Sequence, residues 1–143
     1  RPPFGAGRGA QWLHTMNIPD KFTRAYIDCA LWSSYDNSDE SGGEPFDRNY
    51  SARDIAPETL QRMADDCRQF QDDNRADLDA CGLTLERQGH DFWLNRNGHG
   101  SGFWDEYMNG SPEDEACRRL SEASKAWGSF DLYLGDDDQI HGS

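Results

Sequence analysis

Apolar residues recur at helical spacing in two segments that also carry helix-capping residues. Residues 20–34 place apolar side chains on one helical face behind Asp20, which suits the N-cap position. Residues 111–128 begin with Ser111 and Pro112, continue with acidic residues in the first turn and end at a glycine. The expected core positions are Phe22, Tyr26, Cys29 and Ala30 in the first helix and Cys117, Leu120, Ala123 and Trp127 in the other. Both segments are predicted helices.

Residues 57–81 have the strongest helical pattern, from Pro57 at a first-turn position to a stop at Gly82. The expected buried face comprises Leu60, Met63, Cys67, Phe70, Leu78 and Cys81. Acidic residues recur about every two turns on the opposite side. We call this set the aspartate stripe: Asp65, Asp66, Asp72, Asp73 and Asp79. The pattern predicts that the stripe faces solvent.

The aromatic segments around residues 91–95 and 102–106 are separated by a glycine-rich stretch that contains Asn97 and Gly98. Asn-Gly between aromatic segments is a strong turn signal, so we expect a β-hairpin with an exposed His99 at its tip. The rings that would build the sheet are Phe92, Trp93, Phe103 and Trp104.

Residues 130–134 and 139–141 flank four turn-forming residues and predict a second hairpin, whereas the polar residues 35–56 predict a surface loop. Together these elements predict an α+β fold with about three helices packed on a small antiparallel sheet of two hairpins. Residues 1–19 differ in composition, being rich in Gly, Pro and Arg. We therefore expect an N-terminal arm at residues 1–19, docked on its own domain or on a neighbouring subunit, and a single acidic domain at 20–143.

Charge restricts the partners that the domain can bind. The chain of 143 residues has a formal net charge of −13, and residues 20–143 alone carry −15. Such a surface repels nucleic acids and anionic lipids, because binding them requires Lys and Arg at phosphates. The composition therefore predicts no direct nucleic-acid or membrane partner. It suits a protein partner with a basic surface, divalent cations or simple solubility, and solubility is the commonest explanation of an acidic surface.

The cysteines and the lack of targeting signals favour a cytoplasmic protein. Cys29, Cys67, Cys81 and Cys117 follow helical core positions and form no CxxC pair, which predicts reduced thiols without a disulfide. No apolar run approaches the length of a membrane span, and no segment has the plan of a signal peptide.

The segment 89–105 concentrates the residues that could carry chemistry. His90, Asp91, His99 and Asp105 could supply metal ligands or an acid–base pair, although their spacing matches no known metal motif. The structural alternative is that the aromatic rings build a sheet while Arg96 pairs with the neighbouring aspartates. The sequence contains no catalytic signature, no phosphate loop and no dinucleotide fingerprint, so we expect no cofactor.

Three segments, residues 25–34, 89–105 and 131–137, resemble a group of small uncharacterised acidic proteins encoded by bacteriophages and bacterial mobile elements. The likeness extends over roughly residues 22–137. It implies a viral or plasmid setting, in the host cytoplasm or the virion, and it implies no activity.

The leading hypothesis is a non-enzymatic accessory protein that binds a basic protein partner through its acidic surface, in its sharpest form by mimicking the charge of DNA. The expected contacts are the aspartate stripe together with Arg96 and His99. The alternatives are a metal-binding or hydrolytic domain centred on residues 90–105, and a structural component of a virion.

Overall fold

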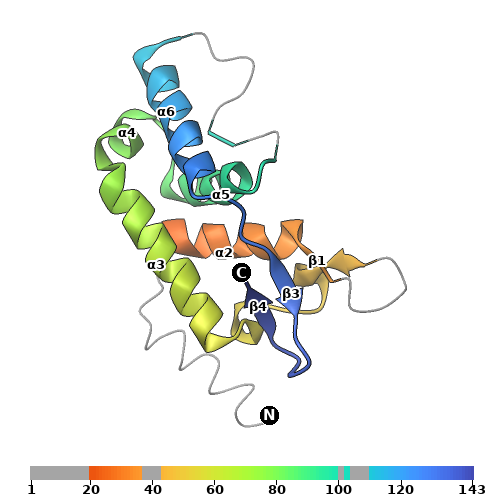
Figure 1. Cartoon of the computed structure of the whole chain (residues 1–143). Helices are drawn as coiled ribbons and strands as arrows, with labels where there is room; N and C mark the ends of the chain where they lie inside the picture. Colours follow the sequence, from red (N-terminus) through yellow and green to blue (C-terminus); the bar gives the residue numbers. More distant parts are fainter. Residues whose placement is uncertain (1–19, 37–42, 100–101, 104–109) are drawn as a thin grey trace.

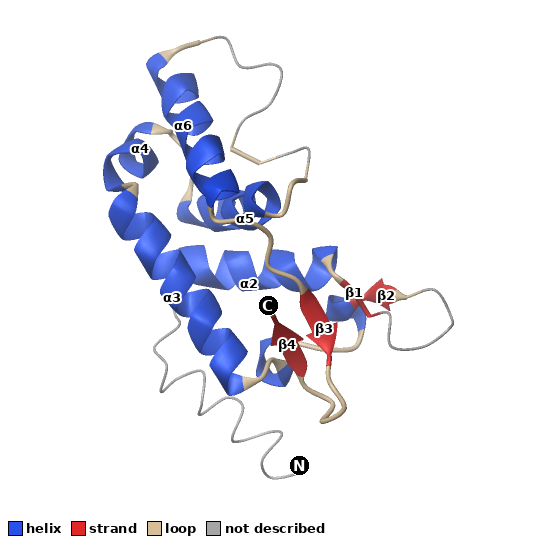
Figure 2. Ribbon diagram, in the orientation of Figure 1, coloured by secondary structure: helices blue, strands red, loops and turns tan. Residues whose placement is uncertain are grey.

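Five α-helices and two short hairpins make up the described part of the chain (Figures 1 and 2). The computed structural model describes residues 20–36, 43–99, 102–103 and 110–143. The helices are α2 (Lys21–Ser33), α3 (Pro57–Asp73), α4 (Arg75–Ala80), α5 (Leu85–Arg96) and α6 (Pro112–Ala126). The strands are β1 (Tyr35–Asp36), β2 (Glu44–Pro45), β3 (Leu132–Leu134) and β4 (Ile140–Gly142). The mixed α and β composition is confirmed, but with more helices than the three predicted.

The core lies between helices and not between helices and a sheet. Helix α5 packs against α2 on one side and α6 on the other, while α3 contacts α2 and α4 contacts α6 (Figure 1). The strands form two separate two-stranded antiparallel sheets, β1–β2 and β3–β4. Sheets of two short strands cannot bury a core of this size alone.

Helices α2 and α6 agree with the sequence prediction, including their caps. The Asp20 carboxylate accepts a hydrogen bond from the Thr23 backbone N–H, and the Ser111 hydroxyl does the same for Asp114. The predicted core positions of α2 are buried, as are Cys117 and Leu120 of α6. Ala123 and Trp127 are partly buried against the same core.

The predicted single helix over residues 57–81 is wrong in one respect, because it breaks at Asn74 into α3 and α4. The Asn74 side-chain amide donates to the carbonyl of Phe70, which already accepts the Asn74 backbone N–H. A side chain that competes for backbone partners in this way weakens helix continuation. The predicted buried face is confirmed, and Gly82 follows α4 with a positive φ of 76°.

The predicted hairpin over residues 91–95 and 102–106 is wrong: residues 91–95 belong to α5. The Thr84 hydroxyl caps this helix by accepting the Arg87 backbone N–H. Helices cover α5 on several sides, and its residues 91–96 are all buried, so it lacks the one-sided pattern of a surface helix. Gly98 adopts the left-handed conformation that an Asn-Gly turn also requires, but here it follows the end of a helix. Of the second predicted strand, only residues 102 and 103 lie within the described residues, and neither is in a strand.

Gly89 allows α2 and α5 to approach closely. A Cβ atom at this position would lie 1.9 Å from the Phe22 carbonyl oxygen, a distance that no side chain tolerates. The glycine is therefore required by close backbone packing.

Aromatic rings fill the space between the helices. Phe70 of α3 and Phe92 of α5 stack with ring centroids 4.0 Å apart, and Tyr26 of α2 meets Trp93 edge-on at 5.3 Å. Phe103 is also fully buried and lies 6.1 Å from Phe70. Phe92, Trp93 and Phe103 were expected to build a sheet, but Phe92 and Trp93 lie on α5 and all three rings are buried in the core between the helices. Trp104, the fourth ring of that prediction, lies outside the described residues.

The second predicted hairpin is confirmed as β3–β4, with Leu132 opposite Gly142 and Leu134 opposite Ile140. The polar segment 35–56 contains more structure than the surface loop predicted. Besides β1 and β2, it forms 3₁₀ turns at Phe46–Arg48 and Ala52–Asp54, and Phe46 is fully buried. Phe46, Ile55 and Ala56 are buried and anchor a segment that is otherwise hydrophilic. The predicted arm at residues 1–19 lies outside the described residues.

Candidate partner-binding surfaces

Four of the five residues of the aspartate stripe reach solvent. The side chains of Asp65 and Asp72 are 46% and 63% exposed. Asp73 at the end of α3 and Asp79 of α4 are exposed as well. Because Leu60, Met63, Cys67 and Phe70 are fully buried, the rotation of α3 is the one that the sequence predicted. Residues 57–80 carry seven carboxylates and three arginines, a net charge of −4.

Arginines and glutamines on the same helices contact part of the stripe. Asp65 pairs with Arg68 at 2.8 Å, and Asp72 lies 3.5 Å from Arg75. The Arg68 and Arg75 side chains are themselves 70% and 57% exposed. Exposed ion pairs of this kind contribute ~0–1 kcal/mol, so a competing cation can replace them at little cost.

Two of the other predicted contact residues, Asp66 and Arg96, form an internal ion pair. Their side chains are 14% and 2% exposed, and the Arg96 Nη1 lies 3.0 Å from an Asp66 carboxylate oxygen. Arg96 also donates to the Tyr26 hydroxyl at 3.1 Å and to the Gly128 carbonyl at 2.8 Å. Arg96, which was predicted to contact a partner, is therefore buried and has little surface to offer, and Asp66 contributes to the core network more than to the surface. The sequence reasoning placed Arg96 in a hairpin, where its side chain would have been free to reach solvent.

Negative charge is even denser on the β3–β4 hairpin. Residues 129–143 contain Asp131, Asp136, Asp137 and Asp138 and no Lys or Arg. Asp137 accepts from His141 at 3.0 Å and from the Gln139 backbone N–H, and these contacts lower the pKa of its carboxyl group. The turn thus organises its own carboxylates, as expected for a solvated turn.

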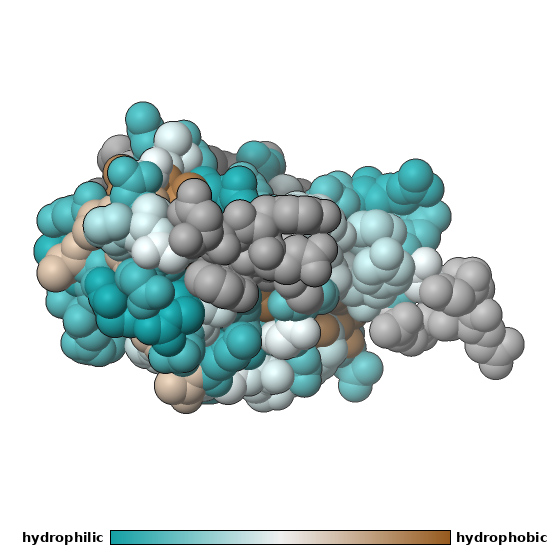
Figure 3. Space-filling model, turned by 90° about the horizontal axis from the view of Figure 1, so that it is seen from above, coloured by the Kyte–Doolittle hydropathy of each residue, from teal (hydrophilic) through white to brown (hydrophobic). Residues whose placement is uncertain are grey.

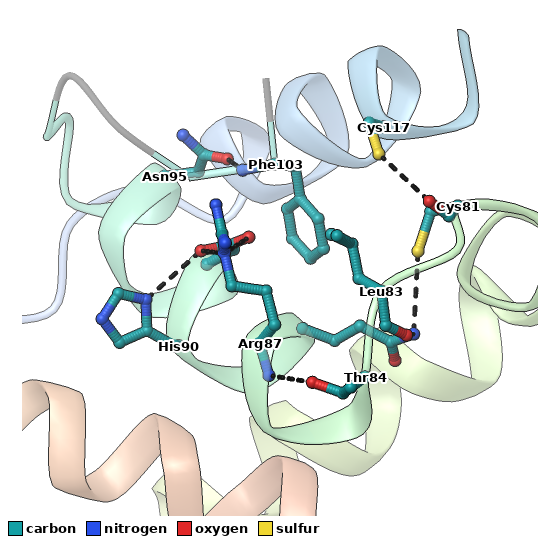
Figure 4. Close-up of polar contacts among 10 residues, drawn as sticks. Cys81, Leu83, Thr84, Arg87, His90, Asn95, Phe103 and Cys117 are labelled. Carbon is teal, nitrogen blue, oxygen red and sulfur yellow. Dashed lines mark hydrogen bonds and ion pairs between the residues drawn. The ribbon is translucent and has the colours of Figure 1, made fainter. Parts of the chain in front are cut away.

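His90 and Asp91 form the part of the predicted chemical site that the structure brings together (Figure 4). Asp91 is 1% exposed and receives the Arg87 guanidinium at 2.9 Å and His90 Nδ1 at 3.2 Å. Burial raises the pKa of the Asp91 carboxyl group, although His90 and Arg87 act in the opposite direction. The His90 ring stacks on Trp32 of α2, with centroids 5.9 Å apart.

These residues border a groove of about 740 Å³ between α2 and α5. Its rim carries charges of both signs, from Lys21, Arg24, Asp28, Glu86 and Arg87, and its floor includes Cys29. Burial raises the pKa of the Cys29 thiol to about 12, so the sulfur stays protonated and is a poor nucleophile. The Cys29 thiol is therefore not an activated nucleophile for the His90–Asp91 pair, and the mixed charges on the rim favour neither an anionic nor a cationic ligand.

The other members of the predicted chemical site lie elsewhere. His99 follows the C-terminal end of α5 and is exposed, and its exposure was predicted. Asp105 lies outside the described residues. Within the described ranges, no group of three or more His, Cys, Asp or Glu side chains could hold a metal ion. All four cysteines are buried with free thiols, in agreement with the sequence prediction.

The described part of the face shown in Figure 3 is predominantly hydrophilic, with small apolar areas. No helix in the described ranges is long and apolar enough to cross a bilayer. Large apolar side chains that remain exposed include Trp32, Tyr35 and Tyr133. The pattern of apolar residues did not identify these rings as exposed, because each ring lies close to residues of the core.

No family model, no curated protein and no solved structure matches the chain.

Proposed function

We propose that this protein is a non-enzymatic accessory protein that binds a basic protein partner through the exposed aspartates of the stripe. The observation that supports the proposal is the outward position of Asp65, Asp72, Asp73 and Asp79 along α3 and α4. On the core side of α3, Leu60, Met63, Cys67 and Phe70 are fully buried. The helix thus presents carboxylates on a rigid support, which an unstructured acidic segment does not provide.

Electrostatics gives this surface two properties that a partner would use. The net charge of −13 attracts a basic protein over distances of about a Debye length, ~8–10 Å at physiological salt. At contact, Lys or Arg side chains of the partner replace the exposed Arg68 and Arg75 at the stripe. Both effects weaken as salt concentration rises, so affinity should fall steeply with ionic strength.

In its sharpest form, the proposal is that the stripe mimics the charge of DNA and occupies a phosphate-binding channel of a nucleic-acid enzyme. Asp65 and Asp72 are seven residues apart, which corresponds to ~10 Å along a helix. The break at Asn74 changes the direction of the chain before Asp79, so the charges do not follow a single straight line. The expected phage or mobile-element setting is part of this proposal, and in that setting the target is a nucleic-acid enzyme of the host cell.

A matched-charge comparison tests whether the stripe itself binds. One variant carries Asp65→Asn, Asp72→Asn, Asp73→Asn and Asp79→Asn. The control carries Glu44→Gln, Asp47→Asn, Glu113→Gln and Glu122→Gln, at exposed positions outside α3 and α4. Both variants have a formal net charge of −9, four units above the −13 of the wild type.

The readout is the fluorescence anisotropy of a labelled octalysine peptide, titrated with each protein at two salt concentrations. We expect the stripe variant to lose about tenfold or more in affinity and the control to lose less than about threefold. Equal losses would mean that net charge alone attracts the peptide, and the proposal would then be wrong. Unchanged circular dichroism of both variants establishes that each is folded.

A further inference from the structure

Three helices end at one cleft of about 390 Å³, which we call the three-helix cleft. Its lining includes Ser34 and Tyr35, which follow α2, and Asn97 and His99, which follow α5. Ser129, three residues beyond α6, and Asp131 complete its polar wall. The residues that form this cleft are far apart along the chain, so no local sequence pattern indicates it.

Helix C-termini carry a partial negative charge, because their last carbonyl groups lack partners within the helix. At α6 this charge is already compensated: the buried Arg96 guanidinium donates to the carbonyls of Gly128 and Trp127 at 2.8 and 3.4 Å. Helix α2 has no basic residue in its last turn. The end of α2 therefore contributes negative potential to the three-helix cleft, and its own last turn supplies no cation to offset that potential.

Asp131 adds a full negative charge to the same wall. The residue is exposed, and among the described residues no cationic side chain forms an ion pair with it. Its backbone is fixed by two hydrogen bonds with Ser143, so the carboxylate extends from an ordered position. The surrounding hairpin, with four aspartates and no Lys or Arg, reinforces the attraction for a cation.

An exposed aromatic ring borders this negative wall. Tyr35 is 53% exposed, and the ring of Trp93 lies at the inner side of the cleft, with its indole N–H donated to the Ser33 hydroxyl at 2.8 Å. The face of an aromatic ring attracts cations, more often arginine than lysine. Serine hydroxyls and backbone carbonyls nearby can accept the several N–H groups of a guanidinium.

We propose that the three-helix cleft binds the guanidinium of an arginine side chain presented by the basic partner. The inference rests on the proposed function, since it assigns a specific anchor to the partner that the aspartate stripe attracts. Asp131 pairs with the guanidinium, and Tyr35 covers its planar face. The volume of the cleft lies within the range of sites that hold small ligands, so one side chain fits.

The test uses N-acetyl-arginine methylamide as the probe, with the citrulline analogue as a matched uncharged ligand. NMR follows the indole N–H signal of Trp93 in the full-length protein. We expect a saturable shift with the arginine probe and at least about fivefold weaker binding of the citrulline and lysine analogues. Asp131→Asn should weaken arginine binding about fivefold and Tyr35→Ala about threefold. The controls Glu122→Gln, at an exposed position of α6, and Tyr133→Ala should remain within about twofold of the wild type.

Equal binding of the citrulline analogue, or no effect of Asp131→Asn, would overturn the proposal. Equal binding of the lysine analogue would refute the preference for a guanidinium. The proposed function is tested separately from the cleft, because octalysine binding depends on the stripe and not on Asp131. If the cleft fails these tests while the stripe variant still loses affinity for octalysine, the protein binds a basic partner through the stripe and has no arginine anchor in the cleft.

Discussion

Replacing Arg96 with alanine should be among the most destabilising single changes in the protein. The side chain is 2% exposed and pairs with Asp66, which is itself only 14% exposed. It also donates to the Tyr26 hydroxyl and to the Gly128 carbonyl. Its guanidinium lies 5.4–5.8 Å from the ring centroids of three aromatic residues. Arg96→Ala removes all of these contacts at once.

The expected loss in the free energy of unfolding is ~3–4 kcal/mol. Removing one partner of a buried ion pair costs ~3–5 kcal/mol, because the other charge is left without compensation. The partial exposure of Asp66 lets water relieve some of that penalty, which places the estimate toward the lower end. A milder change, Asp66→Asn, keeps a hydrogen-bond acceptor beside Arg96 and should cost ~1–2 kcal/mol.

Urea unfolding followed by tryptophan fluorescence measures these losses. A loss of ~3 kcal/mol lowers the urea midpoint by ~1–3 M for ordinary m-values. Arg68→Ala is the matched control, because its ion pair with Asp65 is exposed and should contribute less than ~0.5 kcal/mol. If Arg96→Ala and Arg68→Ala lower stability equally, then Arg96 is not the internal hub described above. If Arg96→Ala fails to fold, Asp66→Asn can be compared with Arg68→Ala instead, because it changes the other partner of the same ion pair.

Three further predictions concern packing and thiol chemistry. Gly89→Ala should destabilise the protein by ~1–3 kcal/mol in urea unfolding, because the new Cβ would collide with the backbone of α2. Trp93→Ala should cost ~3–5 kcal/mol in thermal unfolding, whereas His99→Ala, at an exposed position, should cost no more than ~0.5 kcal/mol. The thiols of Cys29 and Cys117 should react slowly with iodoacetamide at pH 8 in the native protein and rapidly in urea, because burial raises the pKa of each to about 12.

Each of these has an outcome that would count against it. An unchanged midpoint for Gly89→Ala would mean that α2 and α5 are farther apart than the structure places them. A His99→Ala variant as unstable as Trp93→Ala would show that His99 is buried. Mass spectrometry follows the alkylation of Cys29. If Cys29 reacts as fast in the native protein as in the unfolded chain, the result contradicts its burial.

The elements that could be predicted from sequence are those with one buried face and clear ends. Helices α2 and α6 carry both a periodic apolar face and a capping side chain, and β3–β4 has a turn flanked by apolar residues. Helix α3 was predicted in the correct rotation, so the outward position of Asp65 and Asp72 was recognised from the pattern alone.

Helix α5 could not be recognised because partners surround it. A helix with buried residues on several sides loses its 3.6-residue period, and the short aromatic run at Phe92 and Trp93 then resembles a strand. Gly98 supplied a positive φ, which both a hairpin turn and a helix end require. The misassignment of α5 also placed Arg96 at the surface. Long-range pairs such as Arg96 with Asp66 leave no trace in local periodicity.

The three-helix cleft was beyond sequence reasoning for the same reason. Tyr35, Asn97 and Asp131 come from three separate segments, and only the packing of α2, α5 and α6 brings them together. The groove beside His90 likewise depends on the approach of α2 to α5. Motif spacing can identify residues with useful chemistry, but it cannot show which of them share a site.

The most direct test of the central proposal is an NMR titration of the isotope-labelled protein with octalysine, which maps contacts residue by residue. We expect saturable shifts in the backbone amides around Asp65, Asp72, Asp73 and Asp79, with small changes around Glu113 and Glu122 of α6. Added salt should remove these shifts together. Shifts of equal size around every exposed carboxylate, including those of α6, would contradict a specific role for the aspartate stripe.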